Sequence, residues 1–454
     1  MDAMSATTLP PSPRMPPLLQ TLLFVVAPGP FLSQIRRRYG DVVTFRTGGY
    51  TFVMVSDPAA IKEVFTGSPH MLYAGEANRL LGPALGRRSV LLLDGDEHLR
   101  HRRLMLPPFH GRRMRTYERL MSSAADRAVD SWPVGEPFPI LPSMQTLTLE
   151  VIMEAVFGVG DQPRHAELRR RIREMLRPIS TRFGVLVLAL SGGRLRDRGA
   201  LKRFNDRKAA VNELMYAEIA ARRADPDLEE RDDVFSMLLA ARDEDGGALT
   251  DEEVRDELMT LLIAGHETTA TALAWSFERL LRAPGVLAQA RREIEAGEDD
   301  SYIDAIVKET LRLRPIIPSV GRILQETFEV AGYTLPAGIE VSPAIALTHS
   351  REDLYPDAKA FRPERFLGEG APDTYSWLPY GGGPRRCLGA AFASFEMRVV
   401  LRTVLERAEL EPVGPAERLS RRGITIVPSR GARVRQPRAP RPAASPRAVV
   451  TGTV

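Results

Sequence analysis

The strongest constraint on the fold of this chain is a glycine-rich stretch that carries its single cysteine. Residues 377–389 read Trp-Leu-Pro-Tyr-Gly-Gly-Gly-Pro-Arg-Arg-Cys-Leu-Gly, with the sulfur at Cys387. The glycines allow a tight loop whose backbone can approach a bulky planar group. A helix is predicted over 388–408, so the sulfur is expected at a helix N-terminus, where amide N–H groups and the dipole favour a thiolate. A lone cysteine is more often a small buried hydrophobe, but the loop and its two arginines favour an iron ligand.

The amino-acid composition excludes several classes of protein. The 454 residues are 44% hydrophobic and 26% charged, which is ordinary for a globular protein. One cysteine excludes a disulfide framework and any cysteine-only zinc or iron–sulfur site. The formal net charge is +4, but six arginines and no acid lie between positions 430 and 447, so the rest of the chain is slightly acidic. We therefore expect no nucleic-acid partner.

The pattern of prolines and apolar residues predicts one large domain over residues 31–428. Residues 1–30 are proline-rich and are expected to form an extended arm on the surface. Residues 429–454 are rich in Arg, Pro and Ala and are expected to be disordered. No linker or internal repeat divides the region between them.

Hydrophobic periodicity predicts a mainly α fold with small β-sheets, an α+β class. The longest predicted helix spans about 250–282 and begins with a capping box formed by Thr250 and Glu253. A hairpin is expected at 41–56 around Gly48-Gly49. Further helices are predicted near 96–106, 116–131, 144–158, 164–175, 202–223, 232–242, 285–296 and 301–313, and further strands near 327–330, 338–342 and 424–428.

No membrane span is expected. The most apolar early stretch, Leu18 to Ala27, is about ten residues long, whereas roughly 20 are needed to cross a bilayer. Prolines precede it and no small-residue cleavage site follows, so a signal peptide is not expected. The cytoplasm is the expected location.

Nearly the whole chain resembles the cytochrome P450 family, of a soluble bacterial type. The resemblance rests first on the cysteine loop, where the family's haem-binding pattern matches at Gly383, Arg385, Cys387 and Gly389. It implies haem b between a long distal helix and this proximal loop, with Cys387 as the axial thiolate and with Tyr380 and Gly381 at the haem. Tyr380 is a departure, because the family usually has Phe seven residues before the cysteine. Its hydroxyl is expected to adjust the hydrogen bonding of the sulfur.

A second motif, Ala-Gly-His-Glu-Thr-Thr at 264–269, lies in the middle of the long predicted helix. Ala264 and Thr268 are four residues apart and share a face, where small side chains leave room for a ligand. Thr268 can also hydrogen-bond back to a backbone carbonyl. The family has its oxygen-binding groove here, so the resemblance assigns Ala264 and Gly265 to the haem, and Thr268 and Glu267 to proton delivery. A polar helix interrupted by a glycine is the alternative interpretation.

Glu309 and Arg312 lie three residues apart on a predicted helix, and alone they would be read as a surface salt bridge. The resemblance pairs them with Arg365, in the segment Phe-Arg-Pro-Glu-Arg-Phe at 361–366. It gives this trio a structural role, which is to brace the loop that bears Cys387.

A haem carries two propionates, and buried carboxylates need charged partners. The resemblance supplies His98 and Arg102 from one helix, Arg322 from a strand and Arg385 from the cysteine loop. Alternatively, His98 and Arg102 belong to a solvated basic face, with Arg100, Arg103, Arg112 and Arg113 nearby.

The resemblance implies a haem-thiolate monooxygenase that inserts one oxygen atom of O2 into a substrate by hydroxylation or epoxidation. The remaining length leaves no room for a flavin or nicotinamide domain, so an external ferredoxin or flavodoxin with its reductase is expected, serving a monomer. The arginines near 100–113 and Arg386 offer a basic docking face for such acidic carriers. In so arginine-rich a chain, a cluster of this kind can also arise by chance.

The candidate walls of a substrate pocket are mostly apolar, which favours a hydrophobic small-molecule substrate without identifying it. They comprise the 73–93 segment and Leu261, Leu262, Ala264, Ile317, Ser319, Val320 and Ile424.

Three other classes of function are alternatives to this one. A zinc protease is excluded, because His266-Glu267 begins its motif but Ala270 stands where the second histidine is needed. A haem-thiolate protein that rearranges peroxides without O2 is opposed by the Glu267–Thr268 pair. A haem sensor or carrier would need neither that pair nor a large apolar pocket.

Overall fold

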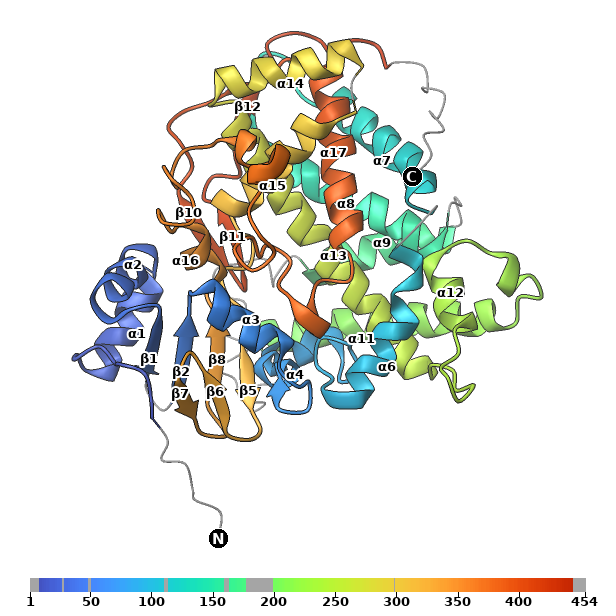
Figure 1. The fold of residues 1–454 in the computed structure, drawn as a ribbon. Helices are drawn as coiled ribbons and strands as arrows, with labels where there is room; N and C mark the ends of the chain where they lie inside the picture. The colour runs from blue at the N-terminus through green and yellow to red at the C-terminus, as the bar shows by residue number, and fades with distance from the viewer. Residues whose placement is uncertain are drawn as a thin grey trace.

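The computed structural model describes residues 8–26, 28–47, 50–109, 113–158, 163–176, 199–297 and 299–443. The fold is mainly α with small β-sheets, as predicted, and the 30-residue helix α13 (Asp251–Leu280) crosses the middle of its helical part (Figure 1). The expected capping box starts this helix. The Thr250 hydroxyl accepts from the Glu253 N–H, and the Glu253 carboxylate accepts from the Thr250 N–H at 2.7 Å. The capping-box prediction is confirmed.

The helical part is built around α13 and two neighbours of 18 residues each, α8 (Ile140–Phe157) and α17 (Ala390–Arg407). Of the helices described, only α8 is long and apolar enough to cross a membrane, and most of it is buried inside the protein. Apolar side chains from these three helices form the main core. The other helices of this part are α6 (Gly95–Met105), α7 (Arg113–Asp130), α9 (Pro163–Leu176), α11 (Gly199–Arg223), α12 (Val234–Ala240), α14 (Pro284–Ala296) and α15 (Ser301–Leu313).

The sheet-rich part lies at the lower left of Figure 1. Its five-stranded sheet has the order β1-β2-β8-β5-β3, in which β2 and β8 are parallel and the other pairs antiparallel. The predicted hairpin is confirmed as β1 and β2, with Thr47 opposite Tyr50, while Gly48 and Gly49 lie outside the described residues. The bounds are β1 (Val42–Thr47), β2 (Tyr50–Val55), β3 (Leu72–Tyr73), β5 (Arg322–Leu324) and β8 (Glu340–Pro343). The short helices α3 (Pro58–Thr66), α4 (Ala74–Ala77) and α5 (Gly82–Leu85) lie between these strands in the sequence, and α16 (Ile345–His349) follows β8.

Three smaller sheets complete the described strands. The hairpin of β10 (Leu419–Arg422) and β11 (Thr425–Pro428) is joined to α13, because Trp275 Nε1 donates to the carbonyl of Ile426 at 2.9 Å. The others are β6 (Phe328–Val330) with β7 (Tyr333–Leu335), and β4 (Pro137–Pro139), β12 (Arg433–Arg435) and β9 (Glu411–Pro412) in the order β4-β12-β9.

The start of the chain differs from the predicted extended arm. Two helices, α1 (Pro17–Val26) and α2 (Pro28–Tyr39), occupy most of it, and of the described residues only 8–16 precede them without regular structure. The reason is packing, because α1 lays Phe24 against Phe52 of β2, with ring centroids 5.8 Å apart. The arm prediction was therefore wrong from residue 17 onward.

The end of the chain also differs from the prediction. Residues 433–435, expected to be disordered, form β12, which pairs with β4 on one side and β9 on the other and buries Val434. Several arginines of the C-terminal segment form ion pairs with acidic residues in the rest of the domain, such as Arg435 with Glu411 at 2.8 Å. Residues 444–454 lie outside the described part of the chain.

Candidate active site

The cysteine loop is closed by its own backbone. The Cys387 N–H donates to the carbonyl of Tyr380 at 2.9 Å, three residues before α17 begins. Gly383 has φ +64°, and a Cβ there would collide with the carbonyl oxygen of Phe65 in α3. At Gly381 (φ +67°) and Gly389, by contrast, no described atom lies within 4 Å of the position of a Cβ. Glycine at position 383 thus allows the loop to contact α3. At Gly381 and Gly389, which are two of the predicted haem contacts, the described part of the protein leaves open space.

The Cys387 side chain has exposed surface, yet the surrounding protein is close enough to desolvate it. Burial raises the pKa of the thiol, while the N–H of Gly389 and the charges of Arg102 and Arg386 oppose that rise. The amide at the helix N-terminus thus favours the thiolate, as expected, but burial outweighs it in the protein alone. A bound metal ion reverses this balance, because a coordinating thiol is deprotonated outright.

The hydroxyl of Tyr380 has a hydrogen-bond partner other than the sulfur of Cys387, contrary to the prediction. Its hydroxyl is 2.7 Å from the hydroxyl of Ser394 on α17, and burial raises the pKa of the phenol. The side chain instead packs edge-on against Trp377, with ring centroids 6.1 Å apart. Tyr380 thus joins the loop to α17.

The four residues predicted to hold the propionates are brought together. The charges of Arg385, Arg102 and Arg322 all act on His98, and together with burial, the largest cause, they lower its pKa to about 3. Burial lowers the pKa of Arg322 and of Arg385 to about 10. Asp94 pairs with Arg385 at 2.5 Å.

This cationic cluster fits an anionic group. Among the described residues, the buried Nδ1 of His98 has no hydrogen-bond partner. The guanidinium of Arg102 donates to the carbonyl of Arg386 at 2.7 Å and also acts electrostatically on Cys387, so it connects the cluster with the cysteine loop. Arg385 is the most fully engaged of the four, since it also donates to the carbonyls of Val90 and Leu93. The arrangement suits the two carboxylates of a haem whose iron binds Cys387.

The predicted structural trio is fully assembled. Arg312 donates to both carboxylate oxygens of Glu309, at 2.6 and 2.8 Å, and neither side chain has exposed surface. Arg365 approaches Glu309 at 3.5 Å. Arg312 also donates to the carbonyl of His349, whose Nε2 accepts from the N–H of Leu378 in the cysteine loop. The trio is therefore linked to the start of that loop by hydrogen bonds.

On α13, one strip of small residues is open. Most of the helix is buried, but Ala264 is exposed, and Leu261 and Thr268, three and four residues away, and the adjacent Gly265 are partly exposed. The hydroxyl of Thr268 donates to the carbonyl of Ala264 at 2.6 Å, the back-bonding that the sequence predicted. This face of α13 thus presents small side chains that are open to a ligand.

Glu267 is held by elements other than its own. Gln145 of α8 donates to Oε2 at 2.8 Å, and Arg422 of β10 lies 3.8 Å from Oε1. His266, next to it in sequence, directs Nδ1 to the carbonyl of Leu262.

The residues predicted to line the substrate pocket differ in their exposure. Leu262 has no exposed surface and belongs to the main core, so its assignment as a pocket wall was wrong. Ile424 is 45% exposed at the turn between β10 and β11. Ile317, Ser319 and Val320 are partly exposed between α15 and β5. With Leu261 and Ala264 they stay predicted pocket residues.

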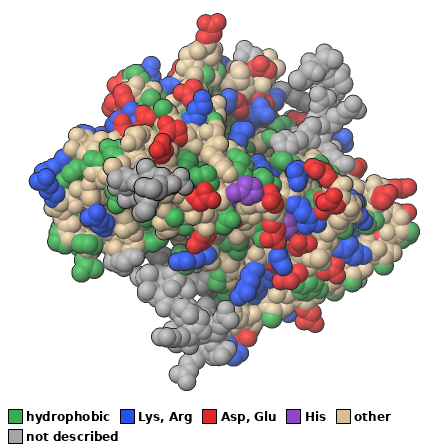
Figure 2. All heavy atoms as spheres, turned by 60° about the horizontal axis from the view of Figure 1, so that its bottom comes forward, with side chains coloured by type: hydrophobic (Ala, Val, Ile, Leu, Met, Phe, Trp, Pro, Cys, Tyr) green, Lys and Arg blue, Asp and Glu red, His purple; other side chains and the backbone are tan. Residues whose placement is uncertain are grey.

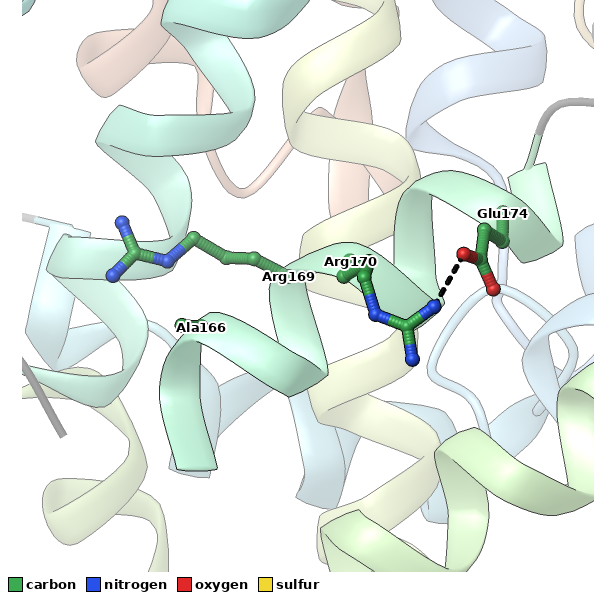
Figure 3. Close-up of a pocket in the computed structure, with 4 residues that line it drawn as sticks. All are labelled: Ala166, Arg169, Arg170 and Glu174. Atoms are coloured by element: carbon green, nitrogen blue, oxygen red, sulfur yellow. Dashed lines mark hydrogen bonds and ion pairs between the residues drawn. The ribbon is translucent and has the colours of Figure 1, made fainter. Parts of the chain in front are cut away.

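A hollow elsewhere on the surface has a different character. It lies along α9, where Ala166, Arg169, Arg170 and Glu174 line it and Arg170 pairs with Glu174 at 2.6 Å (Figure 3). None of these residues belongs to the cysteine loop or to the open strip of α13, and exposed charges of this kind do not make an apolar substrate site.

Comparison with known proteins settles the family. A family model described as Cytochrome P450 matches residues 10–432. The chain belongs to the cytochrome P450 family. It is 45% identical over 444 residues to the putative cytochrome P450 135B1 of Mycobacterium bovis, covering 96% of this chain and 93% of that one. It is 39% identical over 440 residues to the putative cytochrome P450 135A1 of Mycobacterium tuberculosis, covering 96% of each.

Two solved P450 structures share the fold. Retinoic-acid-bound cyanobacterial CYP120A1 superposes with a TM-score of 0.80 at 24% identity, covering 95% of this chain and 99% of that one. The haem domain of cytochrome P450DA gives 0.78 at 24% identity, covering 94% and 97%. P450 proteins are monooxygenases that bind haem b through a cysteine thiolate, so haem b is the cofactor of this chain.

Sequence reasoning missed several residues of this P450 site. Asp94 accepts from the N–H groups of Gly75 and Glu76 and pairs with Arg385. Asp94 stands at the N-cap position of α6 but does not cap that helix with its side chain, and nothing local in the sequence indicates a partner 291 positions away. Gln145 and Arg422 likewise carry no local signal, because their contact with Glu267 arises only in the folded chain.

Proposed function

We propose that this P450 hydroxylates or epoxidises a hydrophobic small molecule with O2, using electrons from a separate ferredoxin or flavodoxin and its reductase. Two electrons and two protons balance the reaction, which gives the oxygenated product and water. The observation that carries the proposal is the open strip at Ala264 and Thr268 in the middle of an otherwise buried helix. Apolar neighbours such as Leu261 support a hydrophobic substrate, and the structural neighbour CYP120A1 is itself described as bound to retinoic acid.

Several side chains of this protein have separate roles in binding the haem. Haem with an axial thiolate supplies the oxygen-activating chemistry when bound. Cys387 binds the iron, and His98, Arg102, Arg322 and Arg385 hold the propionates. This set fits an anionic group because the positive charges of Arg102, Arg322 and Arg385 all converge on His98.

Proton handling falls to α13. The Thr268 hydroxyl donates its own hydrogen to the Ala264 carbonyl, so its lone pairs face outward and can accept a proton or a hydrogen bond. Glu267, with Gln145 on one oxygen, can bind and release a proton close by along the helix.

The docking face for the electron carrier is smaller than the sequence predicted. Arg100 pairs with Asp243 at 2.5 Å, and Arg103 lies 3.5 Å from Glu244. Arg112 and the side chain of Arg113 lie outside the described part of the chain. Arg386 is exposed beside Cys387, and we propose that it contacts the acidic carrier. A monomer in the cytoplasm stays a prediction.

The test begins with the CO difference spectrum of the dithionite-reduced protein. We expect the thiolate Soret band of the family in the wild type and its loss in Cys387→Ser; a band retained by that variant would overturn the haem assignment. Hydrophobic ligands that shift the spin state then supply substrates for NADPH-dependent turnover with a surrogate ferredoxin system. Thr268→Ala should divert electrons to hydrogen peroxide, and unchanged coupling would remove Thr268 from proton delivery.

A further inference from the structure

Helix α1 is apolar on its outer face as well as on the face that packs against the protein. Leu18, Leu19 and Leu22 are 77%, 42% and 56% exposed, whereas the polar Gln20 is 2% exposed. Leucines three and four residues apart share one helix face, so these three leucines form an apolar face of α1 that points away from the protein. A cluster of exposed leucines on a folded helix marks an interaction surface more often than an accident of packing.

The orientation of α1 is fixed by its inner face. Gln20 donates from Nε2 to the carbonyl of Met15 at 3.0 Å and accepts from the N–H of Arg46 in β1 at 3.1 Å. Leu23 and Phe24 pack against the core beneath the β1–β2 hairpin. Turning the leucines inward would break these contacts, so their exposure is a property of the folded protein.

The charge around this face has one sign. Between residues 3 and 40 the sequence contains Arg14, Arg36, Arg37 and Arg38 and no acidic residue. Arg36 pairs with Asp41, but Arg14, Arg37 and Arg38 are exposed. At the left end of Figure 2, the side on which α1 and α2 lie in Figure 1, hydrophobic and basic side chains adjoin.

We propose that the leucine face of α1, with the arginines near it, binds an anionic lipid surface. A short helix with an aliphatic outer face and basic neighbours has the chemistry of an interfacial element that lies on a bilayer without crossing it. Exposed arginines add attraction to anionic headgroups. The body of the enzyme would then be tethered by a rigidly docked helix.

A second copy of the chain fits this face less well. Even a buried aromatic contributes only about 150–250 Å², so three partly exposed leucines fall short of the roughly 800 Å² per partner of a stable interface. Protein interfaces also take their binding energy mainly from Trp, Tyr and Arg rather than from leucine.

Vesicle co-sedimentation of the full chain tests the proposal. We expect binding to vesicles of phosphatidylcholine with phosphatidylglycerol, weaker binding to phosphatidylcholine alone, and release by salt. Leu18→Gln with Leu22→Gln should weaken binding by about tenfold or more, and Arg37→Gln with Arg38→Gln by roughly thirtyfold. Leu419→Gln, which alters a leucine that is 60% exposed on β10, is the matched control and should bind as the wild type does.

Three results would overturn the proposal. One is equal binding by the wild type and the double leucine variant. Another is a loss of binding in the Leu419 control as large as in that variant. The third is a dimer in solution that the leucine substitutions convert to a monomer, since it would assign the face to a second copy. The reduced CO spectrum of each variant reports that the fold and the haem are intact, and it keeps lipid binding separate from the monooxygenase assignment.

Discussion

Gln145 on α8 donates a hydrogen bond of 2.8 Å from Nε2 to Oε2 of Glu267 on α13. The other oxygen, Oε1, is buried, lacks a hydrogen-bond partner among the described residues and lies 3.8 Å from Arg422. The carboxylate proposed to carry protons is thus aimed by side chains from α8 and β10. We infer that Gln145 and Arg422 are positioning residues.

Replacing Gln145 with Leu should slow proton delivery, because the Glu267 carboxylate loses the donor that fixes it. A hydrogen bond to a charged group contributes about 1.5–3 kcal/mol, so we expect kcat to fall by about tenfold while KM and the reduced CO spectrum stay unchanged. Peroxide release and the solvent isotope effect on turnover are the readouts. Gln289→Leu on α14 is the control; an equal loss of kcat there would contradict a specific role for Gln145.

Gly383 and Gly389 should respond differently to alanine. Gly383 has φ +64° and faces the Phe65 carbonyl, whereas Gly389 has φ −87° and open space around the position of a Cβ. We expect Gly383→Ala to lower both the haem content and the melting temperature, and Gly389→Ala to keep the fold. Similar melting temperatures for the two variants would show that the α3 contact does not constrain the loop.

Glu309→Gln should destabilise the protein strongly. It leaves the fully buried Arg312 without its anionic partner, and breaking a buried pair costs about 3–5 kcal/mol. Denaturant unfolding of the holoenzyme measures the change. Glu174→Gln removes the exposed partner of Arg170 (Figure 3) and should leave the midpoint where it is. A small effect of Glu309→Gln would mean that the trio does not brace the cysteine loop.

A buried pair joining α6 to α13 predicts a pH dependence. His101 Nδ1 lies 2.7 Å from Glu257 Oε1, and its Nε2 lies 3.2 Å from Glu253. Burial raises the pKa of Glu257 from 4.5 to about 7. Burial lowers the pKa of His101, but its bonds to the two glutamates outweigh this effect and raise it overall.

Folding therefore favours the protonated form of both groups. The contribution of Glu257 is complete below about pH 4.5 and is lost as the pH rises to about 7, a difference of about 3 kcal/mol. We expect the wild type to lose more stability than Glu257→Gln between about pH 5 and pH 8. Parallel stability curves for the two proteins would contradict this linkage.

Much of the fold was readable from the sequence because its signals are local. Hydrophobic periodicity and the capping residues Thr250 and Glu253 predicted the helix at 251–280, and the glycines predicted the cysteine loop. The ends of the chain were misjudged for a physical reason. Composition predicted an extended arm over residues 1–30 and a disordered tail over residues 429–454, because it could not show that Phe24 and Val434 find partners elsewhere in the chain.

The same distinction between local signals and distant contacts applies to the residues of the candidate site. Residues fixed by a motif, such as Cys387, Thr268 and Arg312, lie where the spacing placed them relative to their neighbours. Leu262 was misplaced because the motif gives the helix but not its rotation, and this side chain turns into the core. The hydroxyl of Tyr380 was assigned to the wrong partner, because Ser394 lies on the following helix and nothing local indicates the contact.

The pairing of β12 with β4 joins residues 433–435 to residues 137–139. The same segment caps α8, since the N–H groups of Ile140 and Leu141 donate to the carbonyls of Ala432 and Gly431. On the ribosome, residue 140 therefore emerges long before the groups that satisfy it, and the first turn of α8 stays open until almost the whole chain has been made. The first turn of α8 and the β4–β12 pairing can therefore be completed only after residues 431–435 have been made, so this part of the domain is among the last to reach its final contacts.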